Sequence, residues 1–116
     1  MVVDDDRLMI ELFESLSSFH DIEVVGKALD GDVALEVYRS IDPPPDIVLM
    51  DQRMPNMSGI ECMREILKID PSAKIIFISA DADALDEAIS EGARAFLVKP
   101  CRVSEIMDTI DRVHNE

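Results

Sequence analysis

The chain of 116 residues has little cysteine, few aromatic residues and no long apolar run. Its two cysteines, Cys62 and Cys101, lie far apart and form no CxxC pair, so neither a disulfide framework nor a zinc site is expected. A reducing, cytoplasmic location suits such a chain. No apolar run approaches the roughly 20 residues of a membrane span. The opening MVVDDD also lacks the features of a signal peptide, so no membrane association is expected.

Positive charge is scarce as well. The chain has 11 Lys and Arg against 25 Asp and Glu, which gives a formal net charge of −14. Such a chain repels polyphosphate backbones, so direct binding to nucleic acid is not expected. Apolar residues make up 47% and charged residues 31%, which is typical of a globular protein. Because there is no internal repeat and no boundary, residues 1–116 are predicted to form one domain.

Short apolar runs alternate with segments whose apolar residues recur at helical spacing. Strands are predicted at 1–3, 22–25, 47–50, 75–78 and 96–98, and helices at 8–16, 34–41, 60–67, 85–89 and 106–113. Strands that are apolar throughout and alternate with helices indicate a parallel sheet with both faces covered. The sequence therefore predicts an α/β fold, a doubly wound (βα)5 domain.

Polar side chains follow four of the five predicted strands. They are Asp4 and Asp5 after the first strand, Asp51 after the third, Ser79 after the fourth and Lys99 after the fifth. Parallel α/β sheets bind their ligands beyond the carboxyl ends of the strands. We therefore expect these side chains to share one site.

Carboxylates gathered in one site need a cation. Two of them about 4 Å apart repel by roughly 4 kcal/mol at an effective dielectric of about 20. Mg²⁺ suits oxygen ligands that leave positions open for water. Lys99 would add a compact positive charge, and Ser79 a hydroxyl donor. Together these groups can hold a phosphoryl group on an aspartate nucleophile.

The segments VVDDD, IVLMDQRMPNMSGIE, KIIFISADA and AFLVKPC resemble the receiver domain of two-component response regulators, the CheY-like family. The segment DIEVVGKALDGDVALE agrees in spacing, so the resemblance covers essentially the whole chain. It implies a flavodoxin/CheY-like sheet of strand order 2-1-3-4-5. It also implies a phosphorylation-dependent signalling switch, whose only chemistry is its own phosphorylation and dephosphorylation, rather than a turnover enzyme.

Carried over residue by residue, the resemblance gives roles to the acidic residues. Asp51 corresponds to the phosphoacceptor and is also a metal ligand. Asp5 corresponds to the direct Mg²⁺ ligand, and Asp4 corresponds to a ligand that acts through water. The backbone carbonyl of Arg53 corresponds to the remaining metal ligand that the protein supplies. Mn²⁺ is expected to substitute for Mg²⁺.

The resemblance also assigns the groups that sense the phosphoryl group. Lys99 corresponds to the lysine that contacts phosphate, and its bond to Pro100 is expected to be cis. Ser79 corresponds to the hydroxyl that binds a phosphoryl oxygen and moves on activation. Phe96 corresponds to the aromatic residue that changes rotamer with it.

The partners implied by the resemblance are proteins. A histidine kinase or a phosphotransfer protein is the expected phosphodonor. The expected recipient of the signal is a downstream protein or a covalently linked output domain. It would read the surface formed by helix 85–89, strand 96–98 and helix 106–113. No output domain is expected within residues 1–116.

Other functions stay open at this stage. A phosphatase of the haloacid dehalogenase type also uses strand-end Asp, Ser or Thr and Lys with Mg²⁺, and Asp4-x-Asp6 mimics its DxD motif. Its nucleophile would be Asp4, but the threonine after that motif and the later acidic pair are missing. A degenerate receiver that binds partners without phosphorylation is the other alternative, although the complete residue set speaks against it. An FMN-binding flavodoxin is rejected, because carboxylates after the first strand would repel the phosphate.

Three details depart from the family pattern or bear on it. The first strand has only Met1–Val3 before the acidic run, which should reduce stability because that strand is internal in the implied order. Arg53 and Asp81 each lie two residues beyond a site residue, and both are hypothesised to influence loss of the phosphoryl group. Asp6 is predicted to cap the following helix rather than to bind metal.

Overall fold

The computed structural model describes residues 1–116 and contains one parallel sheet of order β2-β1-β3-β4-β5. The predicted fold class and strand order are confirmed. The strands are β1 (Val2–Val3), β2 (Lys27–Ala28), β3 (Val48–Met50), β4 (Ile75–Ser79) and β5 (Ala95–Val98). The helices are α1 (Arg7–Leu16), α2 (Gly31–Ser40), α3 (Gly59–Ile69), α4 (Leu85–Ser90) and α5 (Val103–His114), with a 3-10 turn η1 (Ala82–Ala84) before α4.

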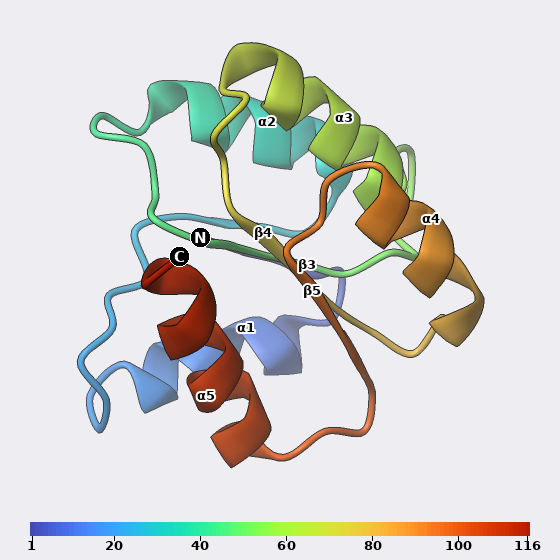
Figure 1. The fold of residues 1–116 in the computed structure, drawn as a ribbon. Helices are drawn as coiled ribbons and strands as arrows, with labels where there is room; N and C mark the ends of the chain where they lie inside the picture. The colour runs from blue at the N-terminus through green and yellow to red at the C-terminus, as the bar shows by residue number, and fades with distance from the viewer.

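Helices cover both faces of the sheet, with α1 and α5 below and α2 and α3 above in the view of Figure 1. The strands supply both cores because successive side chains point to opposite faces. In β4, Ile75 and Phe77 belong to the core under α2, α3 and α4, whereas Ile76 and Ile78 belong to the core over α1 and α5. This explains why the strand is apolar from Ile75 to Ile78.

The second strand lies later than predicted. The segment 22–25 was expected to be β2, but the structure has no strand there and places β2 at Lys27–Ala28. The reason is the register, in which Val2 pairs with Lys27 and Val3 with Ala28. Continued backwards, this register would place Val25 opposite a residue before Met1. The β-branched run therefore has no partner in residues 1–116.

The first strand is as short as the sequence suggested. Only Val2 and Val3 pair with both neighbours, β2 and β3. Met1 is also buried, and its amine donates a hydrogen bond of 2.9 Å to the Ile47 carbonyl. Burial lowers the pKa of this amine to about 6, although the negative charge of Asp46 acts to raise it. The expected loss of stability stays a prediction.

One structural observation bears on the expectation that the chain does not associate with a membrane. None of the five helices combines the length and the apolar character that crossing a bilayer requires.

Candidate functional site

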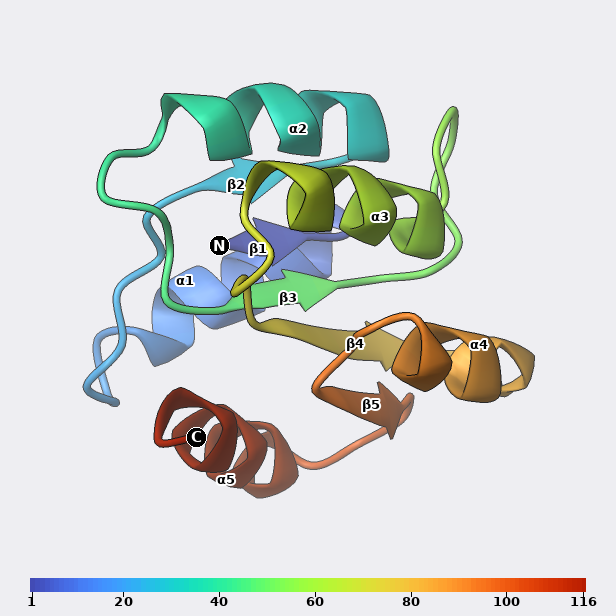
Figure 2. The same ribbon diagram turned by 45° about the horizontal axis from the view of Figure 1, so that its top comes forward.

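The four strand ends that carry the predicted site residues meet at one edge of the sheet. Figure 2 shows β1, β3, β4 and β5 pointing toward this edge. Asp4, Asp51 and Lys99 follow β1, β3 and β5 directly, and Ser79 is the last residue of β4. The chain reaches this edge through backbone pairing, since the Asp51 amide donates to the Val3 carbonyl at 2.9 Å and the Lys99 amide to the Ser79 carbonyl at 2.9 Å.

Three carboxylates form a compact cluster. One oxygen from each of Asp4, Asp5 and Asp51 lies within 4.8 Å of the others. Asp4 and Asp51 are buried and Asp5 is exposed, so the cluster has an open side. Asp6 stays outside it and caps α1, because its carboxylate accepts the Leu8 amide at 3.0 Å. The prediction that Asp6 is an N-cap is confirmed. An all-oxygen donor set with a solvent side fits a hard divalent cation such as Mg²⁺.

Lys99 reaches into the cluster from β5. Its Nζ lies 2.9 Å from Asp4 Oδ2 and 3.7 Å from Asp51 Oδ2. Partial burial disfavours the ammonium, but the hydrogen bond to Asp4 and the charges of Asp51 and Asp4 outweigh it and raise the pKa of Lys99. The lysine therefore stays charged and offsets part of the repulsion among the carboxylates. The bond from Lys99 to Pro100 is cis in this structure.

The surroundings of Asp51 disfavour the ionised form of its carboxyl group. Burial raises its pKa, and the neighbouring charge of Asp4 acts in the same direction. The Ser79 hydroxyl, Lys99 and the Gln52 amide oppose this shift without cancelling it. The Gln52 amide donates to Asp51 Oδ1 at 2.8 Å, so Oδ2 is the oxygen that faces Lys99.

Ser79 and Phe96 lie on adjacent strands beside this cluster. Ser79 is buried, and its Oγ accepts the Asp81 amide at 3.1 Å. Phe96 is half-buried, and its ring is parallel to that of Phe77 with 5.5 Å between ring centroids. The two rings are directly opposite each other in the register of β4 and β5. The predicted switch residue thus rests on the core side chain two positions before Ser79.

An ion pair spans the two loops that border the cluster. Arg53 Nε donates to Asp81 Oδ2 at 3.2 Å. Arg53 follows β3 and Asp81 follows β4, so this pair links the loop after Asp51 to the loop after Ser79. The sequence singled out both residues separately, but their contact comes from the structure.

Sequence reasoning missed the residues that place the Asp51 loop against α3. The Gln52 side chain accepts the Ile60 amide at 2.9 Å, and the Gly59 amide donates to the Gln52 carbonyl at 2.9 Å. A Cβ atom at Gly59 would overlap the Asp51 carbonyl oxygen. The signal that could have located this helix start is the spacing of Ser58 and Glu61, which form a capping box.

A comparison of the sequence with models of protein families shows the family to which the chain belongs. The family model described as "Response regulator receiver domain" matches residues 1–111. The chain belongs to the response regulator receiver family. Receiver domains are components of two-component signalling, and this membership supports a signalling protein rather than a phosphatase.

Relatives of this receiver domain include chemotaxis proteins. The chemotaxis protein CheY of Thermotoga maritima is 40% identical over 115 residues, which cover 97% of this chain and 94% of the relative. CheY of Bacillus subtilis is 35% identical over 117 residues, with 99% and 96% covered.

Solved structures agree with these relatives. CheY of Borrelia burgdorferi, in a complex with CheX, BeF3 and Mg²⁺, has a TM-score of 0.90 at 29% identity, covering 97% of this chain and 85% of that one. The response regulator TrrA of Thermotoga maritima, in complex with Mg²⁺ and BeF, has a TM-score of 0.86 at 29% identity, covering 97% and 95%. The receiver fold thus extends over nearly the whole chain.

Proposed function

We propose that this receiver domain is a phosphorylation-dependent switch whose phosphoacceptor is Asp51. The observation that carries the proposal is the cluster of Asp4, Asp5 and Asp51 oxygens within 4.8 Å, with the Lys99 ammonium 3.7 Å from Asp51 Oδ2. No single strand end supplies this chemistry, and the fold brings the groups together from β1, β3 and β5. The proposed domain, response regulatory in type, comprises residues 1–116.

The phosphodonor is a histidine kinase or a phosphotransfer protein. Asp51 Oδ2 attacks the phosphorus atom of a phosphohistidine, a new P–O bond forms, and the P–N bond breaks. The electron pair stays on the imidazole, which takes up a proton. Lys99 then lies beside the charge on the phosphoryl oxygens, and Ser79 donates its hydroxyl hydrogen to one of them.

Asp5 and Asp51 would hold Mg²⁺ directly, Asp4 would act through water, and the Arg53 carbonyl would supply a further oxygen. The relatives solved with Mg²⁺ support this assignment, and Mn²⁺ is the expected substitute. When bound, the metal neutralises negative charge on the phosphoryl oxygens. Since Lys99 already pairs with Asp4 at 2.9 Å, Asp5 and Asp51 retain free oxygens for the cation.

The switch starts at Ser79. A phosphoryl group on Asp51 draws the Ser79 hydroxyl toward it, and the Phe96 ring leaves its stack on Phe77 for the vacated space. The surface made of α4, β5 and α5 then changes its preference for a downstream protein or a linked output domain. The phosphoryl group needs only to shift a population between two states. We expect this exchange to take place in the cytoplasm.

The decisive experiment measures intact-protein mass after incubation with acetyl phosphate, with and without Mg²⁺. The expected result is a Mg²⁺-dependent phospho-adduct that disappears in Asp51→Asn and persists in Asp4→Asn at a lower yield. An adduct that survives in Asp51→Asn but is lost in Asp4→Asn would point instead to the phosphatase chemistry. The geometry disfavours that outcome, because both Asp4 oxygens are engaged, one by Lys99 and one by the Asp6 amide.

Absence of an adduct in folded protein would support the third reading, a receiver that binds partners without phosphorylation. A circular dichroism spectrum of the same sample establishes that it is folded. Phosphotransfer from a histidine kinase to wild type and not to Asp51→Asn would then complete the assignment of the donor.

A further inference from the structure

Gln52, the residue after Asp51, makes one hydrogen bond to the Asp51 carboxylate and two to α3. Its amide donates to Asp51 Oδ1 at 2.8 Å. Its side-chain carbonyl accepts the Ile60 amide at 2.9 Å, and its main-chain carbonyl accepts the Gly59 amide at 2.9 Å. Gln52 therefore joins the carboxylate that is proposed to react to the first turn of a helix.

Two residues hold the start of α3. The first amides of a helix have no acceptor within the helix. In α3 these are the amides of Gly59 and Ile60, and Gln52 accepts both. The next amide, that of Glu61, donates to Ser58 Oγ at 3.2 Å in the capping box. Of the two capping residues, Gln52 is the one that is also bonded to the phosphoacceptor.

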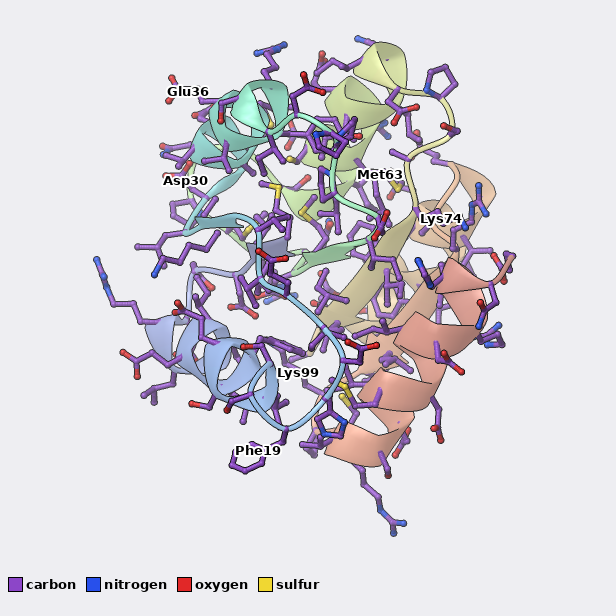
Figure 3. All side chains as sticks on the ribbon, turned by 90° about the vertical axis from the view of Figure 1, so that its left-hand side faces the viewer. Phe19, Asp30, Glu36, Met63, Lys74 and Lys99 are labelled. Atoms are coloured by element: carbon purple, nitrogen blue, oxygen red, sulfur yellow. The ribbon has the colours of Figure 1, made fainter.

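The helix that Gln52 contacts is firmly packed on the sheet. Its inner residues Ile60, Met63 and Ile66 are buried, and Figure 3 shows Met63 between α3 and the sheet. Met63 belongs to the same core as Met50 of β3 and Phe77 of β4. Close packing of this kind resists displacement. The first turn of α3 is therefore a fixed support for the loop that follows Asp51.

The peptide group between Asp51 and Gln52 is restrained on both sides. Its carbonyl oxygen lies so close to Gly59 that a Cβ atom there would overlap it, and its N–H group points at Asp51 Oδ1. Because a peptide group is planar, the carbonyl and the N–H group can turn only together. While Gln52 is bonded to α3, Oδ1 stays with the amide and Oδ2 stays toward Lys99, at 3.7 Å.

We propose that Gln52 is a positioning residue for phosphoryl transfer, which acts by fixing the oxygen of Asp51 that faces Lys99 and the incoming phosphorus atom. This inference rests on the proposed role of Asp51 as the phosphoacceptor. The side chain of Gln52 acts at a distance from the reacting atoms, through its bond to α3 and through the restrained peptide group. Its loss would let the carboxylate rotate, and a misaligned nucleophile reacts more slowly.

The test compares two substitutions of similar length. Gln52→Met removes the acceptor for the Ile60 amide, whereas Gln52→Glu keeps an acceptor and places a carboxylate where a helix N-terminus favours it. The rate of adduct formation is measured by intact mass over a range of acetyl phosphate concentrations, at saturating Mg²⁺. The rate constant at saturating acetyl phosphate should fall about tenfold in Gln52→Met, the usual effect of losing one hydrogen bond. The half-saturating concentration should not change, and Gln52→Glu should stay within about twofold of wild type.

Ser58→Ala is the matched control for a purely structural role. It removes the other side-chain bond at the start of α3, so its thermal stability should fall about as much as that of Gln52→Met. Its rate constant should nevertheless stay within about twofold of wild type, because Ser58 is not bonded to Asp51. Equal slowing by Ser58→Ala and Gln52→Met would overturn the proposal, as would a wild-type rate in folded Gln52→Met. If Gln52→Met does not fold, Gln52→Asn takes its place with the same expectation, because its amide is too short to reach Ile60.

A second measurement does not depend on phosphorylation. Exchange of the backbone amide hydrogen at position 52, followed by NMR, should be about tenfold faster in Gln52→Met than in wild type and unchanged in Ser58→Ala. Failure of the proposed function would show as the absence of an adduct in wild type. Failure of the role of Gln52 would show as wild-type exchange at this amide in Gln52→Met.

Discussion

At the scale of single residues, Tyr38 offers a direct test of the packing under α2. It is the one tyrosine of a chain without tryptophan, so its ionisation can be followed alone by ultraviolet absorbance. Burial raises its pKa to about 12, and the charge of Asp70 and the 3.2 Å hydrogen bond donated to Asp70 Oδ2 add to this shift.

The expected outcome is a phenolate signal that grows near pH 12 in the folded protein, not near the ordinary value of 10.0. Between these values the folded chain retains a proton that the unfolded chain releases, so stability falls as the pH rises through that window. Asp70→Asn should move the pKa of Tyr38 downward, because it removes the negative charge. A phenolate signal near pH 10 in wild type, while circular dichroism still shows the native fold, would contradict the burial of Tyr38 and its hydrogen bond to Asp70.

Arg53 and Asp81 supply a second residue-scale prediction. Their ion pair at 3.2 Å bridges the loops after β3 and β4. We expect Arg53→Asn and Asp81→Ala each to shorten the lifetime of phosphorylated Asp51 severalfold, because either one removes this bridge between the two loops beside the phosphoryl site. The double variant should add little to the single ones, since both remove the same contact.

The lifetimes are measured by following the decay of the phospho-adduct by mass spectrometry. Lys27→Ala is a suitable control, because it breaks another ion pair of 3.2 Å, to Glu14, outside the site. Its lifetime should equal that of wild type. Unchanged lifetimes in Arg53→Asn and Asp81→Ala would remove the role assigned to both residues.

At the scale of elements, the start of α3 limits where Asp51 can lie. A Cβ atom at Gly59 would overlap the Asp51 carbonyl and come within 2.8 Å of the Phe77 ring. Gly59→Ala should therefore lower the free energy of unfolding by roughly 1–3 kcal/mol, the usual cost of overpacking. Urea denaturation measures the change. Lys68→Ala, on the exposed side of the same helix, should stay within about 0.5 kcal/mol of wild type, and an equal effect of the two substitutions would contradict the steric argument.

The elements also show how far the sequence could predict this fold. Apolar periodicity located all five helices, and strand-end polar residues predicted that Asp4, Asp51 and Lys99 would meet. Apolar periodicity failed at Ile22–Val25. These β-branched residues have the composition of a strand, but a strand also needs a neighbour to pair with, and the short β1 does not provide one. Local pattern carries no information about register, which is set between segments distant in sequence.

The sequence could not predict the finer contacts of the site either, because these also depend on segments that are distant in sequence. The Arg53–Asp81 contact joins residues 28 apart, and each alone is an ordinary surface charge. The close approach of Gly59 to the Asp51 carbonyl depends on how α3 packs, which no local spacing encodes. The stack of Phe96 on Phe77 likewise follows from the pairing of β4 with β5.

At the scale of the whole molecule, charge dominates. The net charge of −14 makes the folded state self-repelling, and the carboxylate cluster concentrates that repulsion. Mg²⁺ at one hundred times its dissociation constant should raise the free energy of unfolding by about 2.7 kcal/mol, because it binds the folded state alone. Thermal or urea unfolding with added MgCl₂ provides the measurement.

General screening also stabilises such a chain, so NaCl at equal ionic strength is the required control. The magnesium-specific part should vanish in Asp5→Asn, which removes the exposed carboxylate of the cluster. Equal stabilisation by the two salts would show that the three carboxylates do not form a cation site.

The two cysteines differ in a way that has a practical use. Cys62 is buried, and burial raises its pKa to about 12. Cys101, just after Lys99 and Pro100, is partly exposed, although partial burial raises its pKa as well. A maleimide dye offered to the folded protein should therefore attach at one position only, on the stretch between β5 and α5. The natural sequence would then carry its own fluorescent reporter for the proposed signalling surface, with no cysteine to add or remove.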